Sequence, residues 1–494
     1  MALFVFCSIL VLSIVIAVLA RRGVVTSNMS DIMVASGSFG PFLLFFISVG
    51  EIYSIGTLVG APGAIYSHGA NYGIWFMCYI LLAYAIGYFF NPALWRLGQL
   101  SKAVTIGDLL GWRFNSKAIQ MLTAAVCIMF LMPWVQNQFA GMAILLKYLN
   151  LGIDFTPAVI ISAIIAFIYI ATAGIRSSAY VSILKDALMI VSIVVIGVAA
   201  AMAVPGGVGG IFHAIAAKSP KLLTVTTQPV TAGATFTLST IVFQMLGFYL
   251  LPITVQGTLT SKSAKNLRRN SIYMPLYMLM FPFLVIAAYY ALLTIPGLKV
   301  PDYALLAVSV SLLPSWLVGL MAGGAALTGI LVMAVTALTV GGLFSKNILG
   351  VINPDMKQTQ MVRWTQVATA IFLIGGVILA LYYPTLMASV VTVAYSGLTQ
   401  TFVGMMFAFL WKRSTKWGVG AGLLVGTVTL FLLKTVPYGL NKGLIALLIN
   451  LLVAVVVSLM TTPDQETVSR FEAYIAKSKG PVAAKAGATP LQVV

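Results

Sequence analysis

Residues 40–66 read GPFLLFFISVGEIYSIGTLVGAPGAIY, an apolar run interrupted by helix breakers. About 20 apolar residues are needed to cross the hydrocarbon core of a bilayer as a helix. The breakers are Gly50, Gly56, Gly60, Pro62 and Gly63. They free backbone carbonyl and N–H groups at mid-membrane depth, where such groups can bind an ion or a carboxylate. The stretch therefore predicts a broken transmembrane helix.

A second apolar run, residues 233–259, is interrupted by Gly247, Pro252 and Gly257. The two runs lie five spans apart and so cross the membrane in opposite directions. A pair of oppositely oriented broken helices is typical of an inverted five-plus-five repeat of the leucine-transporter type. Glycine and proline are also common in ordinary membrane helices, so the breakers by themselves leave both interpretations open.

The composition makes lipid the solvent for most of the surface. Hydrophobic residues make up 61% of the 494 positions and charged residues only 8%, against roughly 25% charged in soluble domains. An all-α polytopic membrane protein follows, with about thirteen spans. The expected spans are residues 2–20, 40–66, 71–91, 118–148, 155–173, 179–204, 233–259, 271–294, 317–345, 362–382, 384–411, 417–434 and 443–462.

The net charge of +18 is distributed between alternate loops rather than gathered as a nucleic-acid-binding patch. One side, which we call the basic face, holds Arg21, Arg22, Arg96, Lys102, Arg113, Lys117, Arg176, Lys262, Lys265, Arg268, Arg269, Lys346, Lys357, Arg363, Lys412, Arg413 and Lys416. The other side holds Lys147, Lys218, Lys221, Lys299, Lys434 and Lys442. The positive-inside rule places the basic face in the cytoplasm. A bacterial inner-membrane protein with an outside N-terminus and a cytoplasmic C-terminus is expected.

The chain divides into one membrane domain and a polar tail. We expect a first span with its inside loop at residues 1–31 and a transport core at 32–411, with repeats 32–204 and 205–411. Two accessory spans at 412–462 and a disordered cytoplasmic tail at 463–494 complete the chain. The outside loop at 205–232 should carry a short surface helix around His213.

Ionisable groups at membrane depth are functional candidates because burying them is costly. Glu51 lies in the first broken span, and Lys185 and Asp186 lie in the sixth span. Lys185 is nine residues beyond Arg176, on the order of 13 Å of helix rise from the basic face. Too deep to reach water by snorkelling, Lys185 and Glu51 are expected to pair. The alternative is an ion pair with a purely structural role.

Polar side chains within the spans are candidates for contact with a solute, with ordinary interhelical packing as the alternative. Gln136, Asn137 and Gln138 form a cluster of three amides in the fourth span. The predicted substrate-binding set is Tyr53, Ser54, Thr57, Trp134, Gln136, Gln138, Gln244, Tyr249, Gln256 and Tyr395, with Thr399 a weaker candidate.

Several other functions find no support in the sequence. There is no Gly-rich phosphate loop followed by Lys-Ser/Thr, no Ser-His-Asp set and no metal-ligand spacing. The three cysteines lie in apolar runs. We therefore expect neither an enzyme nor a cofactor, and the remaining alternative from another class is a membrane receptor that senses a ligand without transport.

Three motifs resemble those of sodium–solute symporters. Ser54–Gly69 (SIGTLVGAPGAIYSHG) resembles that family's first broken helix, and Thr172–Met189 (TAGIRSSAYVSILKDALM) its Gly-Gly-x-Arg/Lys-Ala helix. Thr260–Asn270 (TSKSAKNLRRN) resembles its basic inside loop, and Phe344–Asn347 (FSKN) lies where the family usually has Thr-x-Asp. The resemblance covers about residues 2–470 and implies secondary transport by a monomeric functional unit.

Within the family, three short stretches are similar to bacterial monocarboxylate uptake permeases: GEIYS at Gly50–Ser54, PWVQNQFAG at Pro133–Gly141 and SAYVSILKD at Ser178–Asp186. The resemblance implies uptake of a small carboxylate such as lactate, pyruvate, acetate or a small amino acid.

The chain departs from the family at its sodium site. The positions that resemble the ninth-span hydroxyl pair are Leu331 and Val332, and the sixth-span Asp corresponds to Ser182. Lys185 is one helical turn away on the same face. The resemblance therefore implies coupling to H⁺ through Lys185, Glu51, Asp186 and Ser182. Na⁺ coupling through other oxygens, such as Thr336 or Thr339, and exchange without a coupling ion are the alternatives.

Overall fold

The computed structural model describes residues 1–20, 28–148, 154–382, 387–435 and 437–479. This part of the chain is all-helical, with one isolated parallel bridge between Phe39 and Ser261. Arg21 and Arg22 of the basic face, and residues 480–494 of the expected tail, lie outside the described residues.

Helices follow one another with short connections. In the first half they are α1 (Ala2–Leu19), α2 (Met29–Val34), η1 (Ala35–Gly37), α3 (Pro41–Ile52), η2 (Gly56–Gly60), α4 (Ala61–His68), α5 (Ala70–Ser101), α6 (Ile106–Arg113), α7 (Lys117–Tyr148), α8 (Phe155–Ala173), α9 (Ile175–Met202), α10 (Gly207–Lys218) and η3 (Pro220–Leu223).

The second half continues with α11 (Ala234–Gly247), η4 (Phe248–Leu250), α12 (Pro252–Leu259), α13 (Ala264–Tyr277), η5 (Met278–Met280), α14 (Phe281–Thr294), η6 (Pro301–Tyr303), α15 (Ala304–Leu312), α16 (Ser315–Gly342), η7 (Leu343–Leu349), α17 (Gly350–Ile352), α18 (Gln358–Tyr382), α19 (Met387–Leu398), α20 (Thr401–Leu410), α21 (Lys416–Leu432), η8 (Pro437–Gly439), α22 (Lys442–Met460) and α23 (Gln465–Lys479). The helix α10 lies where the sequence predicts a short surface helix around His213 and confirms that prediction.

Among the described residues, eight helices are long and apolar enough to span a membrane, or up to eleven if each of three bent pairs is one span. The expected spans 155–173 and 417–434 correspond to α8 and α21. In α8 the apolar part that is described, Val159–Ile168, is too short to count, and α21 has 17 residues. The multi-span architecture is confirmed, while the count of thirteen remains a prediction.

The first predicted break lies between α3 and η2. The helix α3 ends at Ile52 because Tyr53 adopts a non-helical conformation, with φ −85° and ψ 87°. The hydroxyl of Ser54 then accepts a hydrogen bond from the N–H of Gly56, which starts the next turn. The two halves, Pro41–Ile52 and Gly56–His68, meet at an angle of 51°.

The second predicted break lies at Leu251, and Pro252 begins α12 at a position where its missing N–H is tolerated. The segments on either side are bent by 42°. A third break, which the sequence analysis does not predict, separates α19 from α20 at Thr399 and Gln400 and also bends by 42°.

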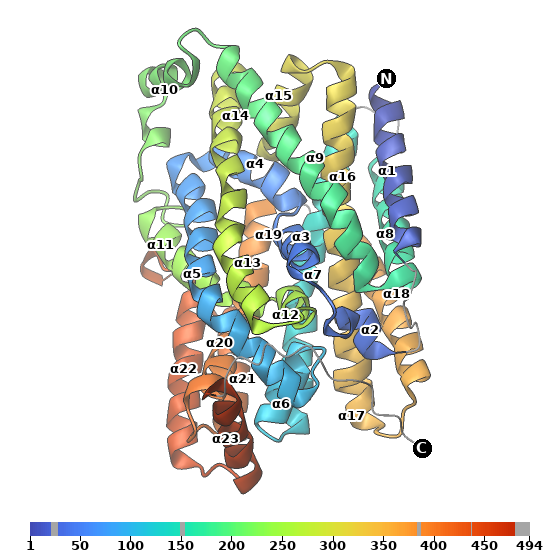
Figure 1. The fold of residues 1–494 in the computed structure, drawn as a ribbon. Coiled ribbons are helices and arrows are strands. Elements are labelled where there is room, and N and C mark those ends of the chain that lie inside the picture. The colour runs from blue at the N-terminus through green and yellow to red at the C-terminus, as the bar shows by residue number, and fades with distance from the viewer. Residues whose placement is uncertain (21–27, 149–153, 383–386, 436, 480–494) are drawn as a thin grey trace.

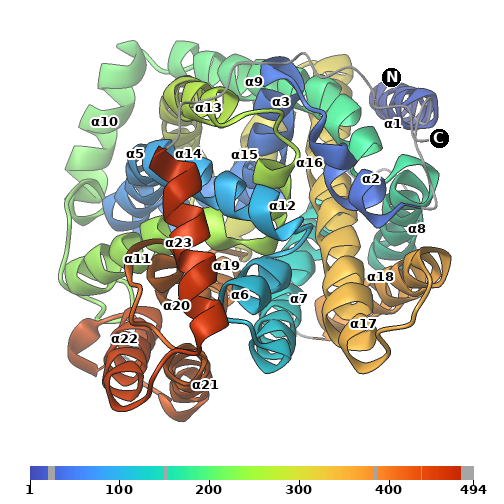
Figure 2. The same cartoon turned by 60° about the horizontal axis from the view of Figure 1, so that its bottom comes forward.

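The breaks lie inside a bundle built around α16. Small residues let its neighbours approach closely. Within the most apolar stretch of this helix, 94% of the residues are buried. Figures 1 and 2 show α21 and α22 paired at one edge of the molecule and α1 at the opposite edge. The helices α6, α17 and α23 lie in the lower part of Figure 1.

The expectation of a disordered tail does not hold for residues 465–479, which form the amphipathic helix α23. Its apolar side packs on the membrane domain, where Phe471 and Tyr474 are buried. The buried Arg113 of α6 donates a 3.0 Å hydrogen bond to the carbonyl of Thr467, and its guanidinium lies 4.8 Å from the ring centre of Phe471. These contacts with the membrane domain stabilise α23, and the polar sequence of residues 465–479 does not reveal them.

Candidate functional site

Lys185 on α9 reaches the first break. Its ammonium donates hydrogen bonds to the carbonyl oxygens of Tyr53 at 2.8 Å and Gly50 at 3.3 Å. These carbonyls lack helical partners because α3 stops at Ile52. The Lys185 side chain is completely buried, so a fixed positive charge lies where the break leaves backbone oxygens free.

Asp186 is the carboxylate that neutralises Lys185, at 2.6 Å and with both side chains fully buried. Tyr277 of α13 donates to the same Asp186 oxygen at 3.2 Å. Ser182 lies one turn earlier on α9, where its hydroxyl donates to the Ser178 carbonyl at 2.8 Å. A Cβ built on Gly50 would come within 2.5 Å of the Ser182 oxygen, so this serine faces α3.

The expected pair between Glu51 and Lys185 is not present. Glu51 is buried, and neither of its carboxylate oxygens has a hydrogen-bond partner among the described residues. The side chain turns instead toward the second broken span, where a Cβ on Gly257 would lie 2.7 Å from Glu51 Oε2. The difference arises because Asp186, adjacent in sequence to Lys185, is the nearer carboxylate.

The three amides of α7 point to different places. Gln136 is half-buried, and its amide approaches the carbonyl of Leu379 on α18 at 3.5 Å. Gln138 donates to the carbonyl of Trp134 on its own helix at 3.3 Å, which leaves its buried amide oxygen without a partner. The residue that meets the first break is Asn137. A Cβ on Gly56 would lie 2.6 Å from Asn137 Nδ2, and neither polar atom of this buried amide has a described partner.

The second and third breaks meet each other. A Cβ on Gly247 would lie 1.9 Å from the hydroxyl oxygen of Thr399. Thr399, at the third break, therefore packs directly against the backbone of Gly247 and leaves no room for a side chain there. This Thr399 hydroxyl is buried and has no partner among the described residues. Gln244, about two turns before the second break, accepts a 2.6 Å hydrogen bond from the indole of Trp75, and its amide nitrogen has no partner among the described residues.

Aromatic side chains surround this region. The ring of Tyr395 lies 5.9 Å from that of Trp134 and 5.7 Å from that of Tyr79. Tyr53 and Tyr84 join their hydroxyls at 2.6 Å, and Tyr249 packs against Gly87 of α5. The structure therefore gathers most of the predicted polar and aromatic candidates around the three breaks.

The remaining predicted residues are Gln256, Thr57 and Thr336. Gln256 donates to the carbonyl of Met33 and accepts from the hydroxyl of Thr339, so it ties α12 to α2 and α16 near the basic face. Thr57 is buried in η2, next to the first break. Thr336 is buried without a described partner.

Leu331, at a position where the family resemblance implies a sodium-binding hydroxyl, contributes an apolar side chain near the first break. A Cβ on Gly50 would lie 3.4 Å from a methyl group of Leu331, so this residue occupies the position facing the break. Within the described ranges, no group of three or more His, Cys, Asp or Glu residues could hold a metal ion.

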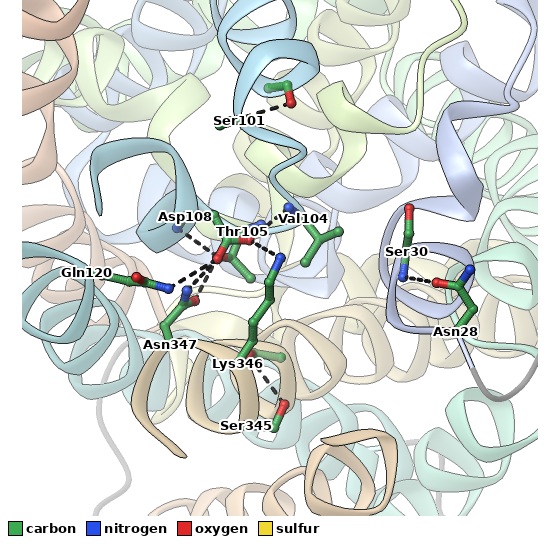
Figure 3. A network of polar contacts seen from close by, with 12 residues as sticks. Asn28, Ser30, Ser101, Val104, Thr105, Asp108, Gln120, Ser345, Lys346 and Asn347 are labelled. Carbon is green, nitrogen blue, oxygen red and sulfur yellow. Dashed lines mark hydrogen bonds and ion pairs between the residues drawn. The ribbon is translucent and has the colours of Figure 1, made fainter. Parts of the chain in front are cut away.

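A second polar network ties the basic face together (Figure 3). Asp108 of α6 accepts hydrogen bonds from Lys346 at 2.8 Å and Asn347 at 2.7 Å, both on η7. The same carboxylate caps its own helix through the N–H groups of Val104 and Thr105. The Phe344–Asn347 stretch thus anchors the end of α16 to the α5–α6 connection.

Sequence reasoning missed Asn137, Thr399 and Trp75 as leading candidates. Asn137 is one of three adjacent amides, and only the helix rotation decides which of them faces the break. Thr399 lies in a stretch, residues 387–410, that contains no proline, so the third break left no strong signal in the sequence.

These features define a class of protein: a polytopic helical membrane protein in which broken spans enclose unpartnered polar groups, the architecture of a solute carrier. A family model described as the sodium:solute symporter family matches residues 32–426. The chain belongs to the sodium:solute symporter family.

Individual relatives agree with this assignment. An uncharacterized symporter, YhjB of Bacillus subtilis, is 30% identical over 93% of this chain and 97% of its own length. A monocarboxylate transport permease protein of Rhizobium johnstonii is 26% identical over 85% of this chain and 88% of its own. The substrate-bound, outward-open structure of a Na⁺-coupled sialic acid symporter superposes with a TM-score of 0.80 at 15% identity, covering 94% of this chain and 99% of that one. That likeness confirms the fold.

Proposed function

We propose that the protein takes up a small monocarboxylate by secondary active transport with alternating access. The observation that carries the proposal is the set of unpartnered, buried polar groups at the breaks: Asn137, Thr399, Gln244 and the indole of Trp134. Buried polar atoms are normally hydrogen-bonded, so such a set is best explained by a solute that supplies the missing partners. This set contains hydrogen-bond donors and no ionised acid, so it is suited to bind the carboxylate group of a solute.

The relatives support the substrate class. The Rhizobium johnstonii relative is described as a monocarboxylate transport permease, and the motifs at Gly50–Ser54 and Pro133–Gly141 lie at the first break and on α7. The ring of Trp134 lies 5.9 Å from that of Tyr395. We propose that this aromatic pair contacts the short side chain of a solute such as lactate, pyruvate, acetate or alanine.

We propose that protons drive the transport, with Lys185 in the place of a bound cation. A cation at the first break would be held by free carbonyl oxygens, and the Lys185 ammonium already occupies those of Gly50 and Tyr53. Glu51 lies between the two broken spans, and its carboxylate has no partner in the part of the chain that the structure describes. An unpaired carboxylate is costly to bury, so Glu51 would bind a proton when α3 and α12 close on it and release it when they separate.

Sodium coupling is the second candidate, and the comparisons favour it. The family description names sodium, and so does the description of the sialic acid symporter. Thr336 offers a buried hydroxyl without a described partner, whereas Thr339 already bonds Gln256. The two coupling ions lead to opposite results in one experiment.

That experiment is uptake of labelled lactate, pyruvate, acetate and alanine into proteoliposomes. Sodium or choline is supplied outside, with and without an inward proton gradient. Proton coupling gives accumulation in choline that follows the gradient and is lost in Glu51→Gln. Strict dependence on sodium, with no effect of the gradient, would refute proton coupling, and no uptake of any carboxylate would refute the substrate class.

The same proposal includes a topology. We propose an inverted repeat, with halves at 32–204 and 205–411, which is consistent with the two oppositely oriented breaks. The proposal also includes thirteen spans, a monomeric functional unit and a cytoplasmic basic face, the last of which is consistent with the loop charges. A green fluorescent protein fused to the C-terminus should fluoresce in the cytoplasm. A dark fusion together with an active periplasmic reporter at the same site would reverse the orientation.

A further inference from the structure

A groove of about 480 Å³ opens between α3 and α13. Its apolar wall consists of Phe42, Phe45 and Phe46 from α3 with Leu276 from α13. Phe42 and Leu276 are 62% and 59% exposed, at positions within membrane spans. The rings of Phe42 and Phe46 lie 4.9 Å apart at their centres and form a continuous aromatic surface. Such a surface suits a hydrocarbon chain.

The groove also has polar lining residues, which come from α13. Arg269 and Asn270 line it, and the Arg269 guanidinium lies 5.4 Å from the ring centre of Tyr273. Among the described residues that line the groove, none is acidic. The flanking segment TSKSAKNLRRN carries four cations and no acid, so the local charge favours an anion.

Asn270 supplies an independent indication of a ligand. The residue is only 6% exposed, and its amide nitrogen is engaged with the hydroxyl of Ser48 on α3 at 3.0 Å. Its amide oxygen has no donor among the described residues. The amide oxygen of Asn270 is therefore a buried acceptor next to Arg269. A ligand that carries both a negative charge and a hydrogen-bond donor would satisfy both residues.

We propose that this groove binds an anionic glycerophospholipid of the phosphatidylglycerol type. The phosphate pairs with Arg269, a headgroup hydroxyl donates to the amide oxygen of Asn270, and an acyl chain lies along the phenylalanine wall. Basic pockets between membrane helices at the basic face are suited to such headgroups. A small carboxylate could not fill the apolar wall, and a zwitterionic lipid would bring a second positive charge beside Arg269. The site is independent of the transported solute and of the coupling ion.

The chain offers a matched control. Arg268 carries the same charge one position earlier, but its guanidinium lies 5.8 Å from the ring of Tyr88 on α5 and does not line the groove. Arg268→Ala and Arg269→Ala therefore remove the same charge from the same helix end. Only the second removes a group from the groove.

The test uses the full chain purified in detergent after incubation with phosphatidylglycerol, phosphatidylethanolamine or phosphatidylcholine, with bound lipid measured by native mass spectrometry. Wild type and Arg268→Ala should retain phosphatidylglycerol in preference to the other two lipids. Arg269→Ala should retain it about tenfold less, the loss expected for one charge-assisted hydrogen bond.

Asn270→Asp, which places a negative charge beside the phosphate, should also lose the lipid. An unchanged melting temperature in phosphatidylcholine shows that each variant is folded. Equal retention in Arg268→Ala and Arg269→Ala, or equal retention of the three lipids, would overturn the proposal. A dimer lost in Phe42→Ser would assign the groove to a second copy of the chain and would also overturn it.

Discussion

The ammonium of Lys185 lies 2.8 Å from the carbonyl oxygen of Tyr53, the first residue beyond the end of α3. A helix side chain thus satisfies a backbone group that the break exposes. Because Asp186 neutralises the ammonium at 2.6 Å, the arrangement is a buried ion pair attached to the broken span rather than an isolated charge. Any movement of α3 relative to α9 must break these contacts, which couples the first break to the charge state of the pair.

Replacing Lys185 with methionine should destabilise the protein because it leaves Asp186 buried without its partner. Breaking a buried pair in this way costs about 3–5 kcal/mol, so the melting temperature in detergent should fall by several degrees. The double variant Lys185→Met/Asp186→Asn should recover most of that stability, because no charge remains unpaired, yet should not accumulate substrate. Full accumulation by the double variant would show that the pair is structural only.

Gly257→Ala should impair transport through Glu51. The added methyl group would lie 2.7 Å from Glu51 Oε2 and must displace the carboxyl group or separate α3 from α12. We expect the uptake rate to fall at least about tenfold, as for a displacement of about 1 Å at a reacting group. Gly420→Ala is the control, because a Cβ there meets no atom closer than 4.0 Å. Equal rates in the two variants would place Glu51 outside the mechanism.

Among the amides of α7, Asn137→Ala should weaken substrate binding most. Asn137 faces the first break with both polar atoms free of described partners, and its loss should cost about 1.5–3 kcal/mol if it donates to a carboxylate. Gln138→Ala should weaken binding several-fold, and Gln136→Ala least, because its amide faces α18. Binding of labelled substrate to purified protein gives the order. Unchanged affinity in Asn137→Ala, Gln138→Ala and Tyr53→Phe would place the site elsewhere.

Asp108→Ala should destabilise the basic face more than Lys346→Ala. Lys346 contributes one partly exposed ion pair, worth up to about 1 kcal/mol, whereas Asp108 also caps α6 and holds Asn347 (Figure 3). The cap and the amide bond each add about 1 kcal/mol. Melting temperatures in detergent should therefore fall in the order wild type, Lys346→Ala, Asp108→Ala. An equal decrease for both variants would contradict the network.

Asp302 should make the contact between η6 and α4 sensitive to pH. Its carboxylate accepts a 3.3 Å hydrogen bond from the N–H of Met387, and Gly63 packs directly against it. Burial raises the pKa of Asp302 to about 7, and the Met387 hydrogen bond opposes this shift. An open, hydrated Asp302 would titrate near its ordinary pKa of about 4. The closed contact is therefore favoured fully below about pH 4, loses stability as the pH rises toward 7, and changes no further above it.

The measurement is maleimide labelling of Ser67→Cys, near the outer end of α4, in a background without Cys7, Cys78 and Cys127. The rate relative to the same cysteine in an Asp302→Asn background should rise from pH 5 to pH 8. Taking this ratio removes the pH dependence of the thiol itself. A constant ratio would show that the contact does not open.

The sequence determined that this protein spans a membrane, that two spans are broken, and that it belongs to its family. These follow from local properties: the length of apolar runs, glycine and proline within them, and short motifs such as SAYVSILKD. It also located Lys185 and Glu51 as buried ionisable residues, because charge at membrane depth is rare whatever the fold.

Only the tertiary structure decided which groups meet. Lys185 pairs with Asp186 while Glu51 turns toward Gly257, because helix rotation sets the direction of each side chain and residues far apart in sequence compete for the same partner. The same rotation selected Asn137 from three adjacent amides. The break at Thr399 and the docking of α23 depend on neighbouring helices, Gly247 and Arg113 among their contacts, so no local pattern could specify them.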